Sequence, residues 1–153
     1  MRRAAAAVLA MFALTAPGAA QTARPMLDYA SAAQIRDGCV AWASERKLAV
    51  AVAVFDERGT LLAFALMDGA ASAVGGYAQW KGRSAATIHV ASAETAKWGS
   101  GPPELATWEG GTPVFSTAGA PLGGVGVSGA ESAEDAACGQ AGIAAAGLRE
   151  TKN

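Results

Sequence analysis

Three glycines near the C-terminus have the spacing of a nucleotide-binding motif. Gly124, Gly126 and Gly129 spell G-x-G-x-x-G between a predicted strand and a predicted helix, the pattern that cradles the pyrophosphate of a dinucleotide. That motif also needs a second strand after the helix and an acidic residue about 20 positions on. The residues that follow the predicted helix here, RETKN, are polar and charged. The glycines therefore predict close packing of strand, turn and helix, and not nucleotide binding.

Residues suited to catalysis are few, and the sequence does not place them together. His89 is the only histidine, so no histidine-rich metal motif and no Ser-His-Asp set is evident. There is no phosphate-binding loop either. Ser128 lies in Val127-Ser128-Gly129, which lacks the flanking residues of a nucleophile elbow. The sequence therefore identifies no catalytic residue and favours a binding protein over an enzyme.

Several carboxylates near the predicted turns could bind a cation at the surface. They are Asp68, Glu131, Glu134 and Asp135. The last three lie at the start of the last predicted helix, where carboxylates complement unpaired backbone N–H groups. Helix capping is therefore the better-supported role for these three.

Cys39 and Cys138 are the only cysteines and lie on the first and last predicted helices. If those helices pack side by side, a disulfide is feasible, and closing a loop of about 100 residues would stabilise the fold by roughly 4–5 kcal/mol. The alternative is two separate buried thiols that each fill a small site in the core. The sequence leaves both alternatives open.

The first twenty residues predict a secretory signal peptide. Arg2 and Arg3 precede an apolar run from Ala4 to Ala16, and small residues lead to a cleavage site after Ala20. The alternative is an uncleaved anchor, for which the apolar run is short. The signal predicts a periplasmic or secreted protein that has no contact with the membrane after cleavage. The net charge of the whole chain is −1, so nucleic acid is not an expected partner.

The remaining sequence predicts a short linker at 21–30 and a single α/β domain at 31–149. Ser31-Ala32-Ala33-Gln34 has the form of a capping box, which would open the first helix. The expected order is a helix, strands 48–55 and 60–67, a helix from 72 to about 90, an irregular segment 91–112, strands 114–117 and 122–127, and a helix from 132 to about 147. Two hairpins of this kind can join as one antiparallel sheet that is covered by helices.

This order, together with five motifs, resembles the GlcG/HbpS family, which is also called the haem-degrading domain family. The motifs are VAVAVFD at 50–56 followed by Gly59, MDGA at 67–70, Lys81 within A-x-x-K-x-x-x-A, GG-x-P at 110–113, and GVGVSGA at 124–130 followed by ED at 134–135. The likeness covers about residues 27–148. Leu66 stands where the family often has arginine and Gly82 where it often has alanine, so no ligand contact through that arginine is expected here.

The resemblance implies a profilin-like fold with a central antiparallel sheet of about five strands, and self-assembly into dimers or larger rings. It also implies reversible binding of haem or a related planar cofactor, in storage, scavenging or sensing, with a sensor protein as a further partner. The alternative is a structural or interaction module with no small ligand, accessory to a sensor or catabolic complex. A third reading is an enzyme that degrades haem or acts on a small metabolite.

If the ligand is haem, it needs an axial ligand and an apolar slot. His89 offers the only imidazole, although it could equally face solvent or cap the second helix. Tyr77 could bind the iron as a phenolate, but it could also be a core or interface residue. Met67 could offer a thioether, although filling the core is the commoner role for such a methionine.

Haem propionates need cations or other polar partners. Lys81 is the first candidate, and the alternatives are an ion pair with Asp68 or Glu94 or a solvated head group on a packed stem. Arg83 is a further candidate, as is Lys97, and Asp68 completes the predicted ligand set. Trp80, Trp98 and Trp108 lie in and around the irregular segment, where they would line a slot for a planar ligand or bury a subunit interface.

Overall fold

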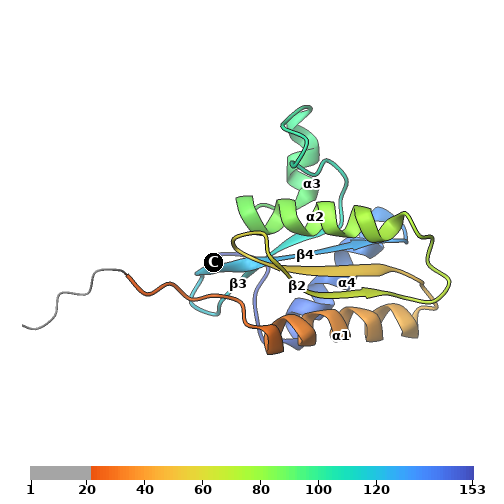
Figure 1. Ribbon diagram of the computed structural model, residues 1–153, viewed down its shortest axis with the longest axis horizontal. Coiled ribbons are helices and arrows are strands. Elements are labelled where there is room, and N and C mark those ends of the chain that lie inside the picture. The colour runs from red at the N-terminus through yellow and green to blue at the C-terminus, as the bar shows by residue number, and fades with distance from the viewer. Residues whose placement is uncertain (1–21) are drawn as a thin grey trace, which may run out of the picture.

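A computed structural model describes residues 22–153 as one sheet with helices on both faces (Figure 1). The predicted signal peptide at 1–20 lies outside the described residues. The elements are α1 (Tyr29–Glu45), β1 (Ala51–Asp56), β2 (Leu61–Leu66), α2 (Val74–Ile88), α3 (Ser92–Thr95), the 3-10 helix η1 (Ala96–Trp98), β3 (Gly111–Phe115), β4 (Pro121–Ser128) and α4 (Ser132–Ala145). Within this part of the chain, no helix has the length and hydrophobicity to cross a membrane.

The sheet has the strand order β2-β1-β4-β3, and every neighbouring pair is antiparallel. The two predicted hairpins therefore join through β1 and β4, which confirms the α/β fold with one antiparallel sheet. The expected number of about five strands is wrong, because the described residues form four. The C-terminal tail makes only one isolated bridge, between Phe115 and Arg149, since the residues beyond it are polar and leave the sheet.

The alternation of valine and glycine along β4 decides which helix covers which face. Val125 and Val127 point into a core of branched side chains beneath α1 and α4. Gly124 and Gly126 point the other way, toward α2, and a Cβ at Gly126 would overlap the carbonyl oxygen of Ala78. Because these glycines carry no side chain, α2 lies directly against the backbone of the sheet. The sequence predicted close packing at this motif, but with the helix that follows it and not with α2.

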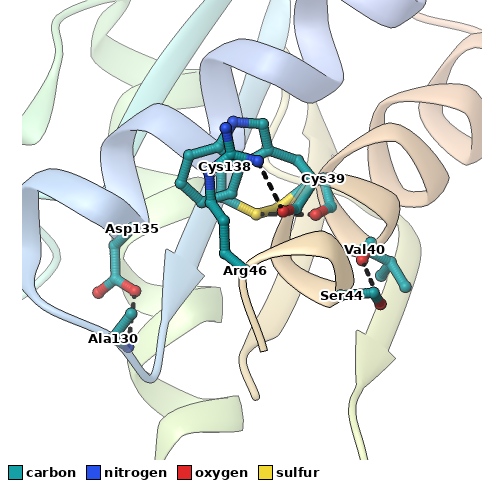
Figure 2. The surroundings of a disulfide bond; sticks show 8 residues. Cys39, Val40, Ser44, Arg46, Ala130, Asp135 and Cys138 are labelled. Atoms are coloured by element: carbon teal, nitrogen blue, oxygen red, sulfur yellow. Dashed lines mark hydrogen bonds between the residues drawn. A yellow bond between two sulfur atoms is a disulfide. The ribbon is translucent and has the colours of Figure 1, made fainter. Parts of the chain in front are cut away.

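The helices α1 and α4 lie side by side on the opposite face from α2 (Figure 1). Their contact is close because Gly142 has no side chain: a Cβ there would overlap the backbone of Ile35. At this contact a disulfide joins Cys39 to Cys138, with 4.7 Å between the two Cα atoms (Figure 2). Of the two arrangements that the sequence left open for the cysteines, the structure has the disulfide.

Two predicted helix starts differ from the structure. The first helix begins at Tyr29 with Asp28 as its N-cap, and the Asp28 carboxylate accepts a hydrogen bond from the N–H of Ser31. The capping box predicted at Ser31 is wrong because Asp28 takes that role one turn earlier. Ser72 does not cap α2, which begins at Val74 without a side-chain cap.

The segment predicted as irregular contains α3 and η1, and it projects from the outer side of α2 (Figure 1). We call residues 92–110 the arm. Its far part, 99–110, has no regular helix or strand. The arm carries Trp98 and Trp108, so its attachment to α2 decides where these two rings lie.

Candidate functional site

Four of the seven predicted ligand residues lie on α2 or at its end. They are Tyr77, Lys81, Arg83 and His89. The helix has 15 residues, which corresponds to about 22 Å of axial length. Tyr77 therefore lies near the first end of α2 and His89 at the last, with Lys81 between them.

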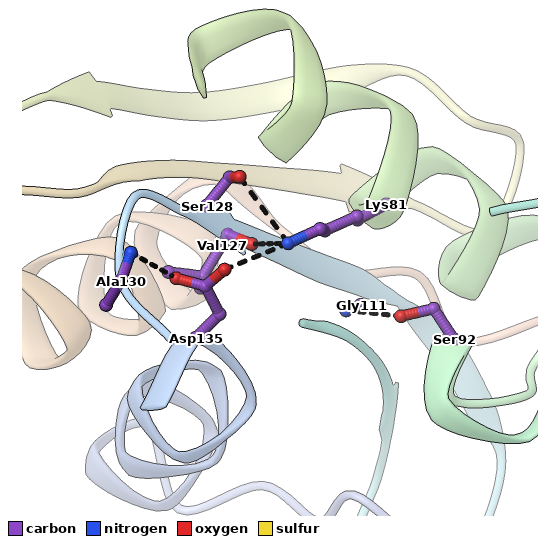
Figure 3. A network of polar contacts seen from close by, with 7 residues as sticks. All are labelled: Lys81, Ser92, Gly111, Val127, Ser128, Ala130 and Asp135. Atoms are coloured by element: carbon purple, nitrogen blue, oxygen red, sulfur yellow. Dashed lines mark hydrogen bonds and ion pairs between the residues drawn. The ribbon is translucent and has the colours of Figure 1, made fainter. Parts of the chain in front are cut away.

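Lys81 reaches the C-terminal end of β4 and forms a buried ion pair with Asp135 (Figure 3). Its Nζ donates to Asp135 Oδ2 at 2.9 Å and to the carbonyl oxygen of Val127 at 3.0 Å, and it lies 3.4 Å from Ser128 Oγ. Both charged side chains are 3% exposed. The ammonium has three donors and three partners, so Lys81 has no donor left for a ligand.

The partner of Lys81 was not predicted correctly, since the sequence suggested Asp68 or Glu94. Asp135 comes close because the chain turns at Gly129, with φ of 137°, and brings the first turn of α4 back to the end of β4. Its second oxygen, Oδ1, accepts the N–H of Ala130 at 3.0 Å. Asp135 therefore joins the turn before α4 to Lys81. The predicted capping bond is not made, because the N-cap residue Glu131 has no side-chain cap hydrogen bond.

His89 ends α2 in the left-handed conformation, with φ of 58°. Its backbone N–H donates to the carbonyl oxygen of Ala85, and its ring lies 6.5 Å from the Phe115 ring. Its Nε2 is buried and has no hydrogen-bond partner among the described residues. An unpartnered imidazole nitrogen can bind iron, but here other protein atoms cover it.

Near the first end of α2, three aromatic rings form one surface, which we call the aromatic surface: Tyr77, Trp80 and Trp108. The Trp108 ring meets the Tyr77 ring edge-on at 5.5 Å and the Trp80 ring at 6.3 Å. Tyr77 is 43% exposed and Trp108 is 56% exposed. Large aromatic side chains usually bury far more of their surface, so this surface is open to a partner. Trp98 lies on η1, is also exposed and makes none of these ring contacts.

Hydrogen bonds fix the arm, and with it Trp108, on α2. The Trp80 Nε1–H donates to the carbonyl oxygen of Pro103 at 2.9 Å. The Ser84 hydroxyl accepts the N–H of Ala106 at 2.9 Å, and the Thr95 hydroxyl donates to the Ala106 carbonyl oxygen. The roles of Ser84 and Thr95 were not predicted from the sequence. The available signal was the position of Ser84, one turn after Trp80 and Lys81 on the same helix.

The other predicted ligand residues lie apart from the aromatic surface. Met67 is partly buried against the core beneath α1, and Asp68 is exposed after β2. Arg83 is exposed, and its guanidinium lies 5.6 Å from the centre of the Phe55 ring. The structure thus does not bring the predicted set into one site.

The cavities do not enclose these residues either. A depression of about 370 Å³ lies between α4 and the C-terminal tail, and one of about 210 Å³ lies between β3, α4 and the start of the arm. Neither is lined by a predicted haem ligand. Among residues 22–153, no group of three His, Cys, Asp or Glu side chains is placed to hold a metal ion.

Comparisons with known proteins place the chain in a family. Residues 27–144 match the family described as "Haem degrading protein HbpS-like". The solved structure of HbpS is 31% identical, with a TM-score of 0.76, and the match covers 86% of this chain and 97% of HbpS. A double mutant of HbpS from Streptomyces reticuli is 30% identical, with the same TM-score, and the match covers 88% and 97% of the two chains.

A complex of PduOC with haem also has a TM-score of 0.76, over 83% of this chain and 99% of PduOC, but only 22% identity, so it supports the fold alone. A search of curated proteins gives no match. The matches to the family and to HbpS cover nearly all of the described fold. On this evidence, the chain belongs to the family of HbpS-like haem-degrading proteins.

Proposed function

We propose that this protein binds haem, or a closely related planar cofactor, reversibly in storage, scavenging or sensing. Membership of the HbpS-like family supports a haem-related role. The PduOC complex shows that, in that protein, a similar fold binds haem. The finer role, between storage, scavenging and sensing, is part of the proposal.

The observation that carries the proposal is the aromatic surface. A phenolate oxygen is one of the protein groups that ligate haem iron, and Tyr77 offers a half-exposed phenol. The neighbouring Trp80 and Trp108 rings offer apolar faces and edges to a flat macrocycle. The arm holds Trp108 beside α2 through the bond from Trp80 to Pro103, so this surface is preformed.

The other candidates fit haem less well. The Nε2 of His89 is covered by protein, so iron could reach it only after the end of α2 had moved. The charge of Lys81 is balanced by Asp135, so Lys81 is not a partner for a propionate. We therefore assign Tyr77 as the axial ligand, with Trp80 and Trp108 in contact with the macrocycle.

A haem titration followed by absorbance tests the assignment. The purified protein should give a saturable Soret shift, and Tyr77→Phe should lose it, because the variant keeps the ring and removes only the phenol oxygen. Tyr29→Phe is the matched control, since Tyr29 is the other tyrosine, is exposed and lies on α1. Tyr29→Phe should bind as the wild type does.

His89→Ala separates the two possible ligands. If His89→Ala loses the shift and Tyr77→Phe keeps it, the ligand is His89 and the assignment of Tyr77 is wrong. If the wild type gives no saturable shift, haem binding itself is wrong.

The absence of a shift would favour the second function, an interaction module without a small ligand. The exposed Trp98 on the projecting arm is the observation that supports that function. Formation of haem degradation products by the haem-loaded protein, with a reductant added, would indicate the third function, an enzyme.

We also propose that the protein is exported, cleaved after Ala20, and assembles into homo-oligomers, with a sensor protein as a further partner. The disulfide supports export, because disulfides persist in oxidising compartments. Sequencing the N-terminus of the protein recovered outside the cytoplasm tests the cleavage site, and a chain that still begins at Met1 would contradict it.

A further inference from the structure

The two edge strands of the sheet, β3 and β2, differ in whether their outward backbone groups are hydrogen-bonded. At the β3 edge, each outward-facing N–H group is bonded or absent. The N–H of Gly111 donates to Ser92 Oγ at 2.8 Å (Figure 3). Pro113 has no N–H, and Phe115 exchanges two hydrogen bonds with Arg149, at 2.7 and 3.0 Å. This edge is therefore closed to another strand.

The β2 edge is open. The N–H of Met67 donates to the Val50 carbonyl oxygen at 3.0 Å, so Met67 faces β1. Backbone groups of an antiparallel strand alternate between its two sides, so Ala65 also faces β1, and Phe64 and Leu66 present their N–H and C=O groups outward. β2 is the last strand on this side of the sheet, and no strand among the described residues pairs with its outer side.

The face of β2 on the α2 side of the sheet is also largely uncovered by a helix. The helix α2 lies over β1, β4 and β3, and only its first turn approaches β2, where Gly75 lies close to the Phe64 ring. Phe64 is 37% exposed and Leu66 is 45% exposed. Edge strands are commonly protected by lysine or proline, and β2 has neither. An open apolar edge of this kind needs a partner.

The sequence of the strand indicates which partner. Residues 62–66 read LAFAL, which is the same in both directions. A two-fold axis through Phe64 would pair Leu62 with Leu66 and Ala63 with Ala65, and it would set Phe64 against itself. The outward-facing Phe64 and Leu66 would then be in the positions that exchange hydrogen bonds between antiparallel strands.

The charges are compatible with a two-fold axis. Such an axis sets equivalent residues against one another, so a charge at its centre would repel its own copy, and β2 carries no charge. At the ends of the strand the same register places Thr60 opposite Asp68, and both are exposed. A hydroxyl donor would thus meet a carboxylate acceptor at each end.

We infer that β2 pairs antiparallel with β2 of a second copy of this chain, about a two-fold axis at Phe64, and that the two sheets become one continuous sheet. The inference concerns an interface between subunits. It does not depend on haem and remains testable if the proposed function fails.

Introducing a positive or a negative charge at Phe64 tests both the β2 interface and the position of the two-fold axis. The wild type should sediment as a dimer, and Phe64→Lys and Phe64→Glu should each fall to half that mass, since each would set like charges together. An equimolar mixture of the two variants should recover the dimer. Ile88→Lys is the control, because Ile88 is equally exposed, at 37%, but lies on α2; it should stay dimeric.

Three results would overturn the inference. They are a wild type that stays monomeric at every concentration tested, single variants that keep the dimer, or a mixture that remains monomeric although the wild type is dimeric. A different oligomer that Phe64→Lys does not disturb would place the interface elsewhere, for example at the arm.

A cysteine cross-link is a second test that does not rely on disrupting the dimer. Opposed residues of a hydrogen-bonded antiparallel pair lie about 5.5 Å apart between Cα atoms, within disulfide range. Both native cysteines are already bonded to each other. Phe64→Cys should therefore give a covalent dimer with oxidised glutathione. Leu61→Cys should not, because its own copy would lie about six residues, or roughly 20 Å, away along the partner strand. Equal cross-linking of both variants, or of neither, would contradict the register.

Discussion

The two faces of the sheet are stabilised in different ways. Beneath α1 and α4, the core consists mostly of branched side chains, and the disulfide joins the two helices. Beneath α2, the buried cluster is mainly alanine with the single large ring of Phe55. Here the glycines of β4 allow close contact, and the ion pair of Lys81 and Asp135 joins α2 to the first turn of α4 at the end of β4.

This difference predicts different sensitivities. Stability from apolar burial scales with the area removed from water, so the α1 and α4 face should respond to lost volume and to the loss of the cross-link. The α2 face buries few large side chains, so it should respond to added volume and to an uncompensated charge. The positions of the functional side chains on α2, including Tyr77, therefore depend on close packing and charge pairing between α2 and the layer beneath it.

The largest expected effect is on the α1 and α4 face. Replacing both Cys39 and Cys138 by alanine should lower the free energy of unfolding by about 4–5 kcal/mol, because the bond closes a loop with a sequence separation of 99. Urea denaturation measures the change. Reduced wild type is the control and should lose a similar amount. A loss below about 1 kcal/mol would mean that the loop-closure account does not apply.

The next effect is on the α2 face. Lys81→Met should lower the free energy of unfolding by about 3–5 kcal/mol, because it leaves the Asp135 carboxylate buried without its partner. Adding Asp135→Leu should recover part of this loss, since no unpaired charge then remains. A double-mutant cycle from urea denaturation measures the coupling. Additive losses would show that the two charges do not act as a pair.

A smaller effect is expected where α2 contacts the sheet backbone. Gly126→Ala should destabilise by about 1–3 kcal/mol, because the new Cβ meets backbone atoms of Ala78 and Gly82. Gly76→Ala is the matched control, since nothing lies within 4 Å of its Cβ position. That variant should stabilise the helix by up to about 1 kcal/mol. The same sign for both variants would argue against close packing as the cause.

The smallest effect lies outside both faces, at the start of α1. The hydrogen bond from the Ser31 N–H holds the pKa of Asp28 below its ordinary value of 3.8. Because the pKa is lower in the folded state, the stabilisation is present above the unfolded-state pKa and is lost as the pH falls through the folded-state pKa. The Tm advantage of the wild type over Asp28→Asn should therefore shrink between about pH 5 and pH 2. An unchanged difference would contradict the role of the charge.

The parts of the fold that follow local rules could be predicted from the sequence. Both hairpins follow from alternation and turn residues that lie close together in the chain. The glycines at 124 and 126 predicted close packing, but the helix they contact, α2, is distant in sequence. The start of α1 was misplaced because Asp28 and Ser31 are both good N-caps, and only the tertiary position of Leu27, which is buried, favours the earlier start.

The candidate site was predicted less completely because its contacts are long-range. Lys81 and Asp135 are 54 residues apart, and their pairing depends on how α4 returns to β4. The aromatic surface depends on Ser84 and Thr95 holding Ala106, which no local pattern indicates. Residue types at the site could be named in advance, but their grouping could not.

The pairing of β1 with β4 has a consequence for synthesis. β1 lies inside the sheet between β2 and β4, and β4 begins only at Pro121. The covalent partner of α1, at Cys138, emerges later still. The N-terminal half of the chain cannot complete its sheet or its disulfide until the C-terminal half has left the ribosome. Contacts this distant in sequence also form slowly. Until then the apolar residues of β1 have no cover, and the nascent chain should depend on chaperones that hold it unfolded.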